Sequence, residues 1–178
     1  MNTIRKALTT ATIIVTLIVG VPPASTAAPG PVERPIGAPM LFDIVDRAAC
    51  ARGMVNHEII RYTAKKQSGL NFYGRVSLTC GFEKAGFKHI KIDHADDWQR
   101  MLTKYGGRGS WDDFMSFATS RALAAPSLVR NVGNGKYCYT TPIQIYQGGK
   151  LVKTFYPKVI VSTTTRTVIT SMPTNKGC

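Results

Sequence analysis

The chain contains three histidines, and two of them, His89 and His94, lie close together in the stretch HIKIDHADDW. Two imidazoles suit metal-independent cleavage of RNA, because a base must take the proton of the ribose 2′-hydroxyl and an acid must protonate the departing 5′-oxygen. A cation must also offset the negative charge that builds on the phosphate, and Lys91, Lys104 and Arg108 are the nearby candidates. Such a site would form a 2′,3′-cyclic phosphate and would need no metal or cofactor.

The spacing of the two histidines restricts how they could meet. Five residues along an ideal helix leave two side chains about 140° apart, and on a strand His89 and His94 would face opposite sides. We therefore expect a bend, with FKHIKI extended and DHADDW at a helix start. The positive end of that helix would lower the pKa of His94 and favour its use as a base. The alternative is that His89 and His94 are ordinary surface histidines without a catalytic role. We interpret the third histidine, His57, in this way.

Several segments of the first two thirds have the apolar spacing of helices. Residues 41–49 and 55–62 predict two helices that break at Gly53. A third is predicted from Asp96 to Tyr105, and a fourth from the N-cap Ser110 to a point before Pro126. The segment NFYGRVSLTCGF alternates and predicts a strand.

The last third is rich in β-branched and aromatic residues. YCYTTPIQIYQ, KLVKTFYPKVIVST and TVITSMP predict an antiparallel meander, with Gly148 and Gly149 as a hairpin turn. Residues 40–178 are thus predicted to form one α+β domain, in which N-terminal helices pack on a C-terminal curved antiparallel sheet of about three to four strands.

The first 27 residues have the pattern of a signal peptide. Arg5 and Lys6 precede the apolar run TTATIIVTLIVGV, and Ala27 is a suitable cleavage position. The run is shorter than the roughly 20 residues that a bilayer-spanning helix needs, which disfavours an uncleaved anchor. We expect a secreted protein with no membrane insertion after cleavage, and an extended Pro- and Gly-rich leader at residues 28–39.

All four cysteines follow the predicted signal peptide, and no CxxC spacing is present. An even number in an exported chain favours two disulfides, for which three pairings exist. We prefer the pairing of Cys50 with Cys80 and of Cys138 with Cys178, because it joins neighbours in sequence.

The formal net charge of +13 favours a polyanionic partner. Aromatic residues near positions 146–156 are interleaved with Lys150, Lys153, Lys158 and Arg166. Aromatics that stack on bases, with cations that bind phosphates, suit single-stranded RNA. The alternative assigns the aromatics to the core and the lysines to edge protection. We take Lys104, Arg108, Lys158 and Arg166 as candidate RNA-binding residues.

The stretches GFKHIKIDHADDW and YPKVIVSTTTRTVITSMPTN together resemble the catalytic domains of small bacterial ribonuclease toxins in the barnase, EndoU, colicin and RelE-like group. The closing strands of those domains often carry a pattern similar to V…IITxYP, which TVITSMP matches except that Met172 replaces the aromatic. The resemblance implies an endoribonuclease with His89, His94, Lys91 and Thr170 as functional residues, the Thr170 hydroxyl contacting the phosphate. It implies an RNA partner, with tRNA as one candidate, and leaves open whether an immunity protein exists.

A second class of function stays open at this level. A non-enzymatic cationic protein that binds cell-wall polymer, a membrane surface or an extracellular enzyme would share the charge and the disulfides. A hydrolase of other chemistry is disfavoured, because the sequence has no GxSxG, HExxH or paired-carboxylate motif.

Overall fold

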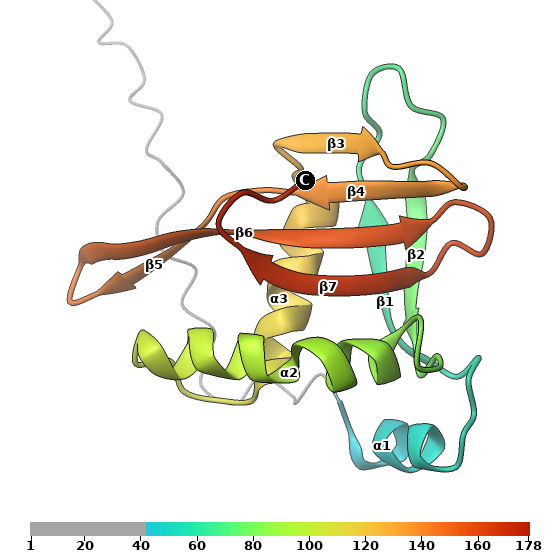
Figure 1. Cartoon of the computed structure of the whole chain (residues 1–178), viewed down its shortest axis with the longest axis horizontal. Helices are drawn as coiled ribbons and strands as arrows, with labels where there is room; N and C mark the ends of the chain where they lie inside the picture. The colour runs from blue at the N-terminus through green and yellow to red at the C-terminus, as the bar shows by residue number, and fades with distance from the viewer. Residues whose placement is uncertain (1–41) are drawn as a thin grey trace, which may run out of the picture. The chain divides into compact units, whose positions relative to one another are not determined.

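The computed structural model describes residues 42–178, which form an α+β domain (Figure 1). The predicted signal peptide and leader lie outside the described residues. The elements follow in the order α1 (Ile44–Ala51), β1 (Glu58–Ala64), β2 (Gly74–Thr79), α2 (Phe87–Lys104), α3 (Trp111–Ala124), β3 (Leu128–Asn131), β4 (Lys136–Thr140), β5 (Ile143–Gln147), β6 (Lys150–Ser162) and β7 (Val168–Thr174).

The long strand β6 organises the larger, five-stranded antiparallel sheet. Its first half pairs with β5 and its second half with β4, which in turn pairs with β3. β7 pairs with the other edge of β6. The sequence predicted three or four strands. It missed β3, and it read β4 and β5 as one run although Pro142 separates them, since proline cannot continue the hydrogen-bond ladder.

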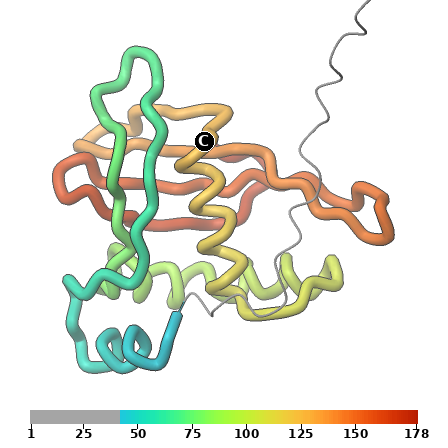
Figure 2. Tube along the Cα trace, turned by 180° about the vertical axis from the view of Figure 1, so that it is seen from behind, coloured from blue at the N-terminus to red at the C-terminus, as the bar shows by residue number. Residues whose placement is uncertain are grey.

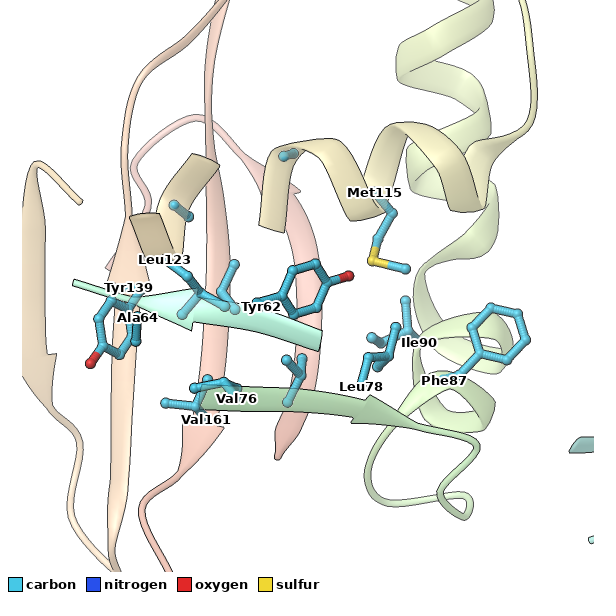
Figure 3. Packing of buried hydrophobic residues seen from close by; sticks show 14 of the residues in the cluster. Tyr62, Ala64, Val76, Leu78, Phe87, Ile90, Met115, Leu123, Tyr139 and Val161 are labelled. Carbon is cyan, nitrogen blue, oxygen red and sulfur yellow. The ribbon is translucent and has the colours of Figure 1, made fainter. Parts of the chain in front are cut away.

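The core lies on one face of this sheet, beneath α3 and the hairpin of β1 and β2. Seen from behind, α3 and the hairpin lie in front of the sheet (Figure 2). Tyr62, Leu78, Met115 and Val161 come from four different elements and are all buried in the same cluster (Figure 3). Buried hydroxyls join the layers as well, because Tyr62 Oη and Ser116 Oγ are hydrogen-bonded at 2.8 Å.

The second predicted helix is wrong, because its residues form the strand β1. Val55, Ile59, Ile60 and Tyr62 have helical spacing, but short apolar runs also fit a strand. In the structure β1 pairs with β2 in antiparallel register, with Tyr62 opposite Val76. The strand reading of NFYGRVSLTCGF is confirmed by β2.

The predicted start of the third helix at Asp96 is also wrong. α2 runs without interruption from Phe87 to Lys104. The alternation in FKHIKI looked extended, but Ile90 is fully buried whereas Ile92 is 59% exposed. A helix accounts for that difference, because residues two positions apart point about 200° away from each other.

The predicted N-cap Ser110 of α3 is confirmed, whereas α1, predicted over residues 41–49, spans Ile44–Ala51. Asp43 caps α1 and Ser110 caps α3, each accepting a hydrogen bond from the backbone N–H three residues later. α3 ends at Ala124, before Pro126, as expected.

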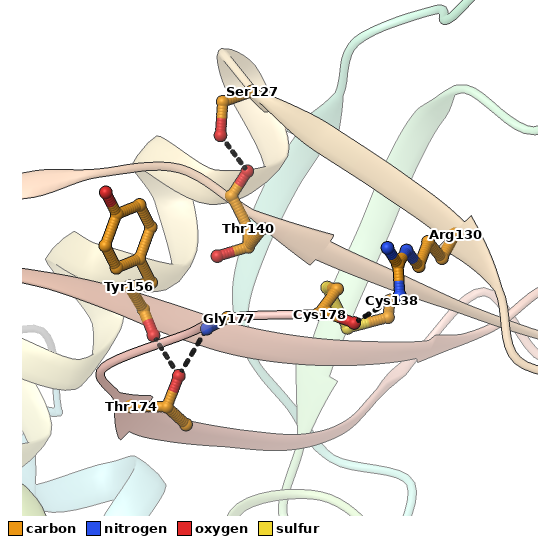
Figure 4. Close-up of a disulfide and its surroundings, with 8 residues drawn as sticks. All are labelled: Ser127, Arg130, Cys138, Thr140, Tyr156, Thr174, Gly177 and Cys178. Carbon is orange, nitrogen blue, oxygen red and sulfur yellow. Dashed lines mark hydrogen bonds between the residues drawn. A yellow bond between two sulfur atoms is a disulfide. The ribbon is translucent and has the colours of Figure 1, made fainter.

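Both predicted disulfides, Cys50–Cys80 and Cys138–Cys178, are present. The second fastens the C-terminal segment, residues 175–178, over β4 (Figure 4). Arg130 donates to the carbonyl of Cys178 at 3.2 Å, and Gly177 N–H donates to Thr174 Oγ1 at 2.7 Å. A Cβ on Gly177 would lie 2.4 Å from Thr140 Oγ1, so only glycine fits there.

Within residues 42–178, no helix is long and apolar enough to cross a membrane.

Candidate active site

His89 and His94 come together on the surface of α2. Their ring centroids lie 5.6 Å apart with the planes nearly perpendicular, and their side chains are only 18% and 15% exposed. The expected bend between them is wrong, since both lie on one regular helix. The two positions are about 140° apart around the helix, but both side chains are long enough for their rings to come into contact.

The ring of His89 is oriented through its Nδ1 atom. Nδ1 lies 3.0 Å from the carbonyl oxygen of Glu83 and 2.9 Å from Asp93 Oδ2. Both partners are acceptors at neutral pH, so Nδ1 carries a proton. The Nε2 atom is then the one that can exchange a proton with a substrate.

His94 lies beside a second aspartate, with Nδ1 3.7 Å from Asp97 Oδ2. Its pKa is lowered below 6.5, first by burial and then by the nearby charge of His89, against the smaller opposing effects of Asp93 and Asp97. The sequence predicted a lowered pKa from the helix N-terminus, but α2 begins two turns earlier. A neutral imidazole at pH 7 is the form that accepts a proton.

Two hydrogen bonds hold α2 against β7 on either side of the histidines. Gly86 N–H donates to the carbonyl of Ile169 at 2.9 Å, and the Trp98 indole donates to that of Ser171 at 3.0 Å. These bonds bracket Thr170 on the strand and both histidines on the helix. Because His94 lies one turn before Trp98, it belongs to the row of side chains that faces β7.

The hydroxyl of Thr170 is buried without a partner. The residue is 7% exposed, and its Oγ1 has no hydrogen bond to any described residue. Thr170 pairs with Ile160, so it lies on the sheet face opposite the core residue Ser171, whose hydroxyl is hydrogen-bonded to Thr119 at 2.8 Å. Burial of an unpaired hydroxyl costs stability.

The candidate cations are placed differently from one another. Lys158 lies opposite Met172, two positions from Thr170 on the same face of the sheet. Lys91 is exposed on α2, and Lys104 lies at its end, with Nζ 5.7 Å from the Tyr105 ring.

Arg108 lies in the exposed loop between α2 and α3. Arg166 lies in the turn between β6 and β7 and donates to the carbonyls of Tyr73 and Arg75 while covering the Phe72 ring at 4.7 Å. Of the predicted cations, Lys158 is thus the one placed beside Thr170 on the sheet, whereas Arg166 is engaged in holding the turn.

The two aspartates and the carbonyl of Glu83 were not among the site residues predicted from the sequence. Asp93 follows His89 by four residues and Asp97 follows His94 by three, which are the spacings of facing side chains on a helix. Recognising the helix from Phe87 onward would have revealed both pairs. His57 has a carboxylate partner of its own, Asp46 Oδ1 at 2.7 Å.

Among residues 42–178, no three histidine, cysteine, aspartate or glutamate side chains are grouped as metal ligands. No protein-family model, curated protein or solved structure matches the chain.

Proposed function

We propose that this protein is a secreted, toxin-like endoribonuclease that cleaves RNA without a metal, by attack of the ribose 2′-hydroxyl on the adjacent phosphate. The observation that carries the proposal is the pair His89 and His94 on α2, whose ring centroids lie 5.6 Å apart and whose rings each lie beside an aspartate. Two adjacent imidazoles supply the base and the acid that this reaction needs. The disulfides and the net charge of +13 suit an extracellular protein that binds a polyanion.

In this mechanism each side chain has a separate role. His94, kept neutral by its lowered pKa, takes the proton from the 2′-hydroxyl. His89 Nε2 gives a proton to the departing 5′-oxygen, while Asp93 fixes the ring. Thr170 and Lys158 bind the phosphate on which negative charge builds, and Lys91, exposed on the same helix as the histidines, assists.

The partner is RNA, with tRNA as one candidate. Lys104, Arg108 and Arg166 contribute positive potential around the site rather than base recognition. A sheet that curves around the bound strand belongs to the same proposal, and an immunity protein would be an additional partner.

Purified protein incubated with tRNA and with total RNA in EDTA tests the proposal. We expect fragments that end in a 2′,3′-cyclic phosphate by mass spectrometry, and no cut where the nucleotide 5′ of the cleaved bond carries 2′-deoxyribose. His89→Gln and His94→Gln should each lower kcat by about 10²-fold or more. His57→Gln is the matched control and should retain full activity.

Full activity in both variants would overturn the assignment. Salt-sensitive binding of RNA and other polyanions, with no turnover and no dependence on the histidines, would favour the cationic binding protein instead.

A further inference from the structure

We propose that a cleft beside the first turn of α2 binds one base of the RNA, next to the phosphate that is cut, and that Phe82 stacks on this base. The inference rests on the proposed function and gives it a specificity site. The cleft has a volume of about 300 Å³, and its lining includes Thr79, Phe82, Gly86, Ser162, Thr165 and Thr167. We call it the base cleft.

The base cleft lies beside the start of the helix that carries the histidine pair. Gly86 lines the cleft and caps α2, and His89 follows three residues later, which is about 4.5 Å along the helix axis. The turn that carries Phe82 also contacts the site, because the carbonyl of Glu83 lies 3.0 Å from His89 Nδ1. A nucleotide whose phosphate lies at the histidines can therefore place its base in the cleft.

Phe82 is an exposed aromatic on a rigid turn. Its side chain is 54% exposed, yet Phe82 and Ala85 exchange two backbone hydrogen bonds of 2.8 and 3.1 Å. Gly81 has φ +64°, and a Cβ there would lie 2.0 Å from the carbonyl oxygen of Ala85, so the turn closes too tightly for any side chain. An aromatic residue on a rigid backbone turn loses less entropy when a base stacks on it than one on a mobile loop.

Another part of the cleft lining supplies polar groups for the edge of a base. It carries the hydroxyls of Ser162, Thr165 and Thr167, and the last two are hydrogen-bonded to each other at 2.7 Å. Hydroxyls both donate and accept, so they can pair with the edge of an unstacked base. The volume lies at the lower end for ligand sites, which fits a single base rather than several.

Steady-state cleavage of a short single-stranded RNA tests the base cleft. Phe82→Ala should raise KM by roughly 5- to 100-fold, as expected for loss of one base-stacking contact, and Phe82→Trp should restore it. Tyr73→Ala is the matched control, because Tyr73 is similarly exposed at 52% but lies outside the cleft lining. It should leave KM unchanged.

Binding of the four nucleoside 3′-monophosphates, followed by NMR, separates this inference from the proposed function. We expect at least one of them to shift the backbone amide signals of Phe82, Gly86 and Thr167. If wild-type protein cleaves RNA but Phe82→Ala and Tyr73→Ala have the same KM, the base cleft is overturned while the ribonuclease stands. If a monophosphate shifts these signals but no RNA is cut, the cleft is supported and the proposed function is overturned. If RNA is not cut and no monophosphate shifts these signals, both the base cleft and the proposed function are overturned.

Discussion

At the scale of single residues, burial affects the protonation of His94 and the hydrogen bonding of Thr170. His94 is mostly buried and lies beside another imidazole, so its charged form is disfavoured and its pKa falls. Thr170 is buried with an unpaired hydroxyl, whereas neighbouring Ser171 on β7 is satisfied by Thr119. The two residues closest to the proposed chemistry on α2 and β7 thus both carry a cost in stability.

We expect the low pKa of His94 to appear in the pH dependence of stability. Its folded pKa lies below the unfolded value of 6.5, so the unfolded state binds more protons between the two values. The contribution of His94 is complete above pH 6.5 and is lost as the pH falls through the folded pKa. The free energy of unfolding, measured in urea at pH 7 and pH 5, should fall more for the wild type than for His94→Gln. Equal losses would contradict this assignment.

Thr170→Val should separate activity from stability. The change removes a buried hydroxyl that has no partner among the described residues, so we expect the free energy of unfolding to stay the same or rise by up to about 1 kcal/mol. Loss of a donor to the phosphate should lower kcat by about 10²-fold. Urea unfolding and RNA cleavage of the same preparation measure both. Lower stability with unchanged cleavage would make Thr170 a structural residue only.

At the scale of elements, the sequence predicted caps, turns and disulfides better than the identity of short apolar segments. Ser110 and the Gly148–Gly149 turn act locally, and their residue types suffice to place them. β1 was read as a helix because the pairing that makes it a strand comes from β2, which follows it in the chain. The apolar residues of FKHIKI are ambiguous in the same way, so the first part of α2 was predicted to be extended.

The candidate site was only partly predictable for a related reason. The residue types of His89 and His94 pointed to acid–base chemistry, but an ideal helix separates them by 140°, so their contact depends on side-chain rotamers that tertiary packing selects. Asp93 and Asp97 followed from the spacing once the helix was known. The base cleft could not be predicted, because the strands and loops that line it are distant in sequence.

The hairpin of β1 and β2 offers a prediction at this scale. Glu58 accepts hydrogen bonds from Arg75, Ser77 and Arg61, which together hold its pKa at about 2. Its contribution is present above pH 4.5 and is lost as the pH falls toward 2. Glu58→Gln should lower the free energy of unfolding by about 1 kcal/mol at pH 7, with a difference that shrinks steadily below pH 4.5.

The control for the hairpin is Glu83→Gln, because Glu83 is 75% exposed and its carboxylate lies 3.6 Å from Lys88. This variant should change the free energy of unfolding by less than about 0.5 kcal/mol. Equal effects of Glu58→Gln and Glu83→Gln would show that the hairpin network adds nothing beyond an exposed ion pair.

At the scale of the whole domain, two disulfides fasten the ends of the described chain to its middle. Cys50–Cys80 ties α1 to the end of β2, and Cys138–Cys178 ties the C-terminal segment to β4. They close loops of 30 and 40 residues, so each should stabilise the fold by about 3 to 4 kcal/mol through the unfolded chain. Together they amount to a large part of the roughly 5 to 15 kcal/mol that a domain typically has.

Replacing both members of one pair by serine tests this estimate. Cys50→Ser with Cys80→Ser, and Cys138→Ser with Cys178→Ser, should each lower the free energy of unfolding by about 3 to 4 kcal/mol in urea. Reducing the wild type with dithiothreitol should lower it by about the sum of the two. A pair whose removal changes stability by less than 1 kcal/mol would show that its loop is already ordered in the unfolded chain.

The two tryptophans of the chain both lie at contacts of the helix that carries the histidines. Trp98 is buried against β7 and donates to Ser171, and Trp111 stacks on Phe87 at the first turn of α2, with ring centroids 5.6 Å apart. Tryptophan emission depends on the polarity around the indole ring. The intrinsic fluorescence of this protein is therefore an optical reporter of α2 docking. Without any added label, it can show whether a histidine variant lost its chemistry or its structure.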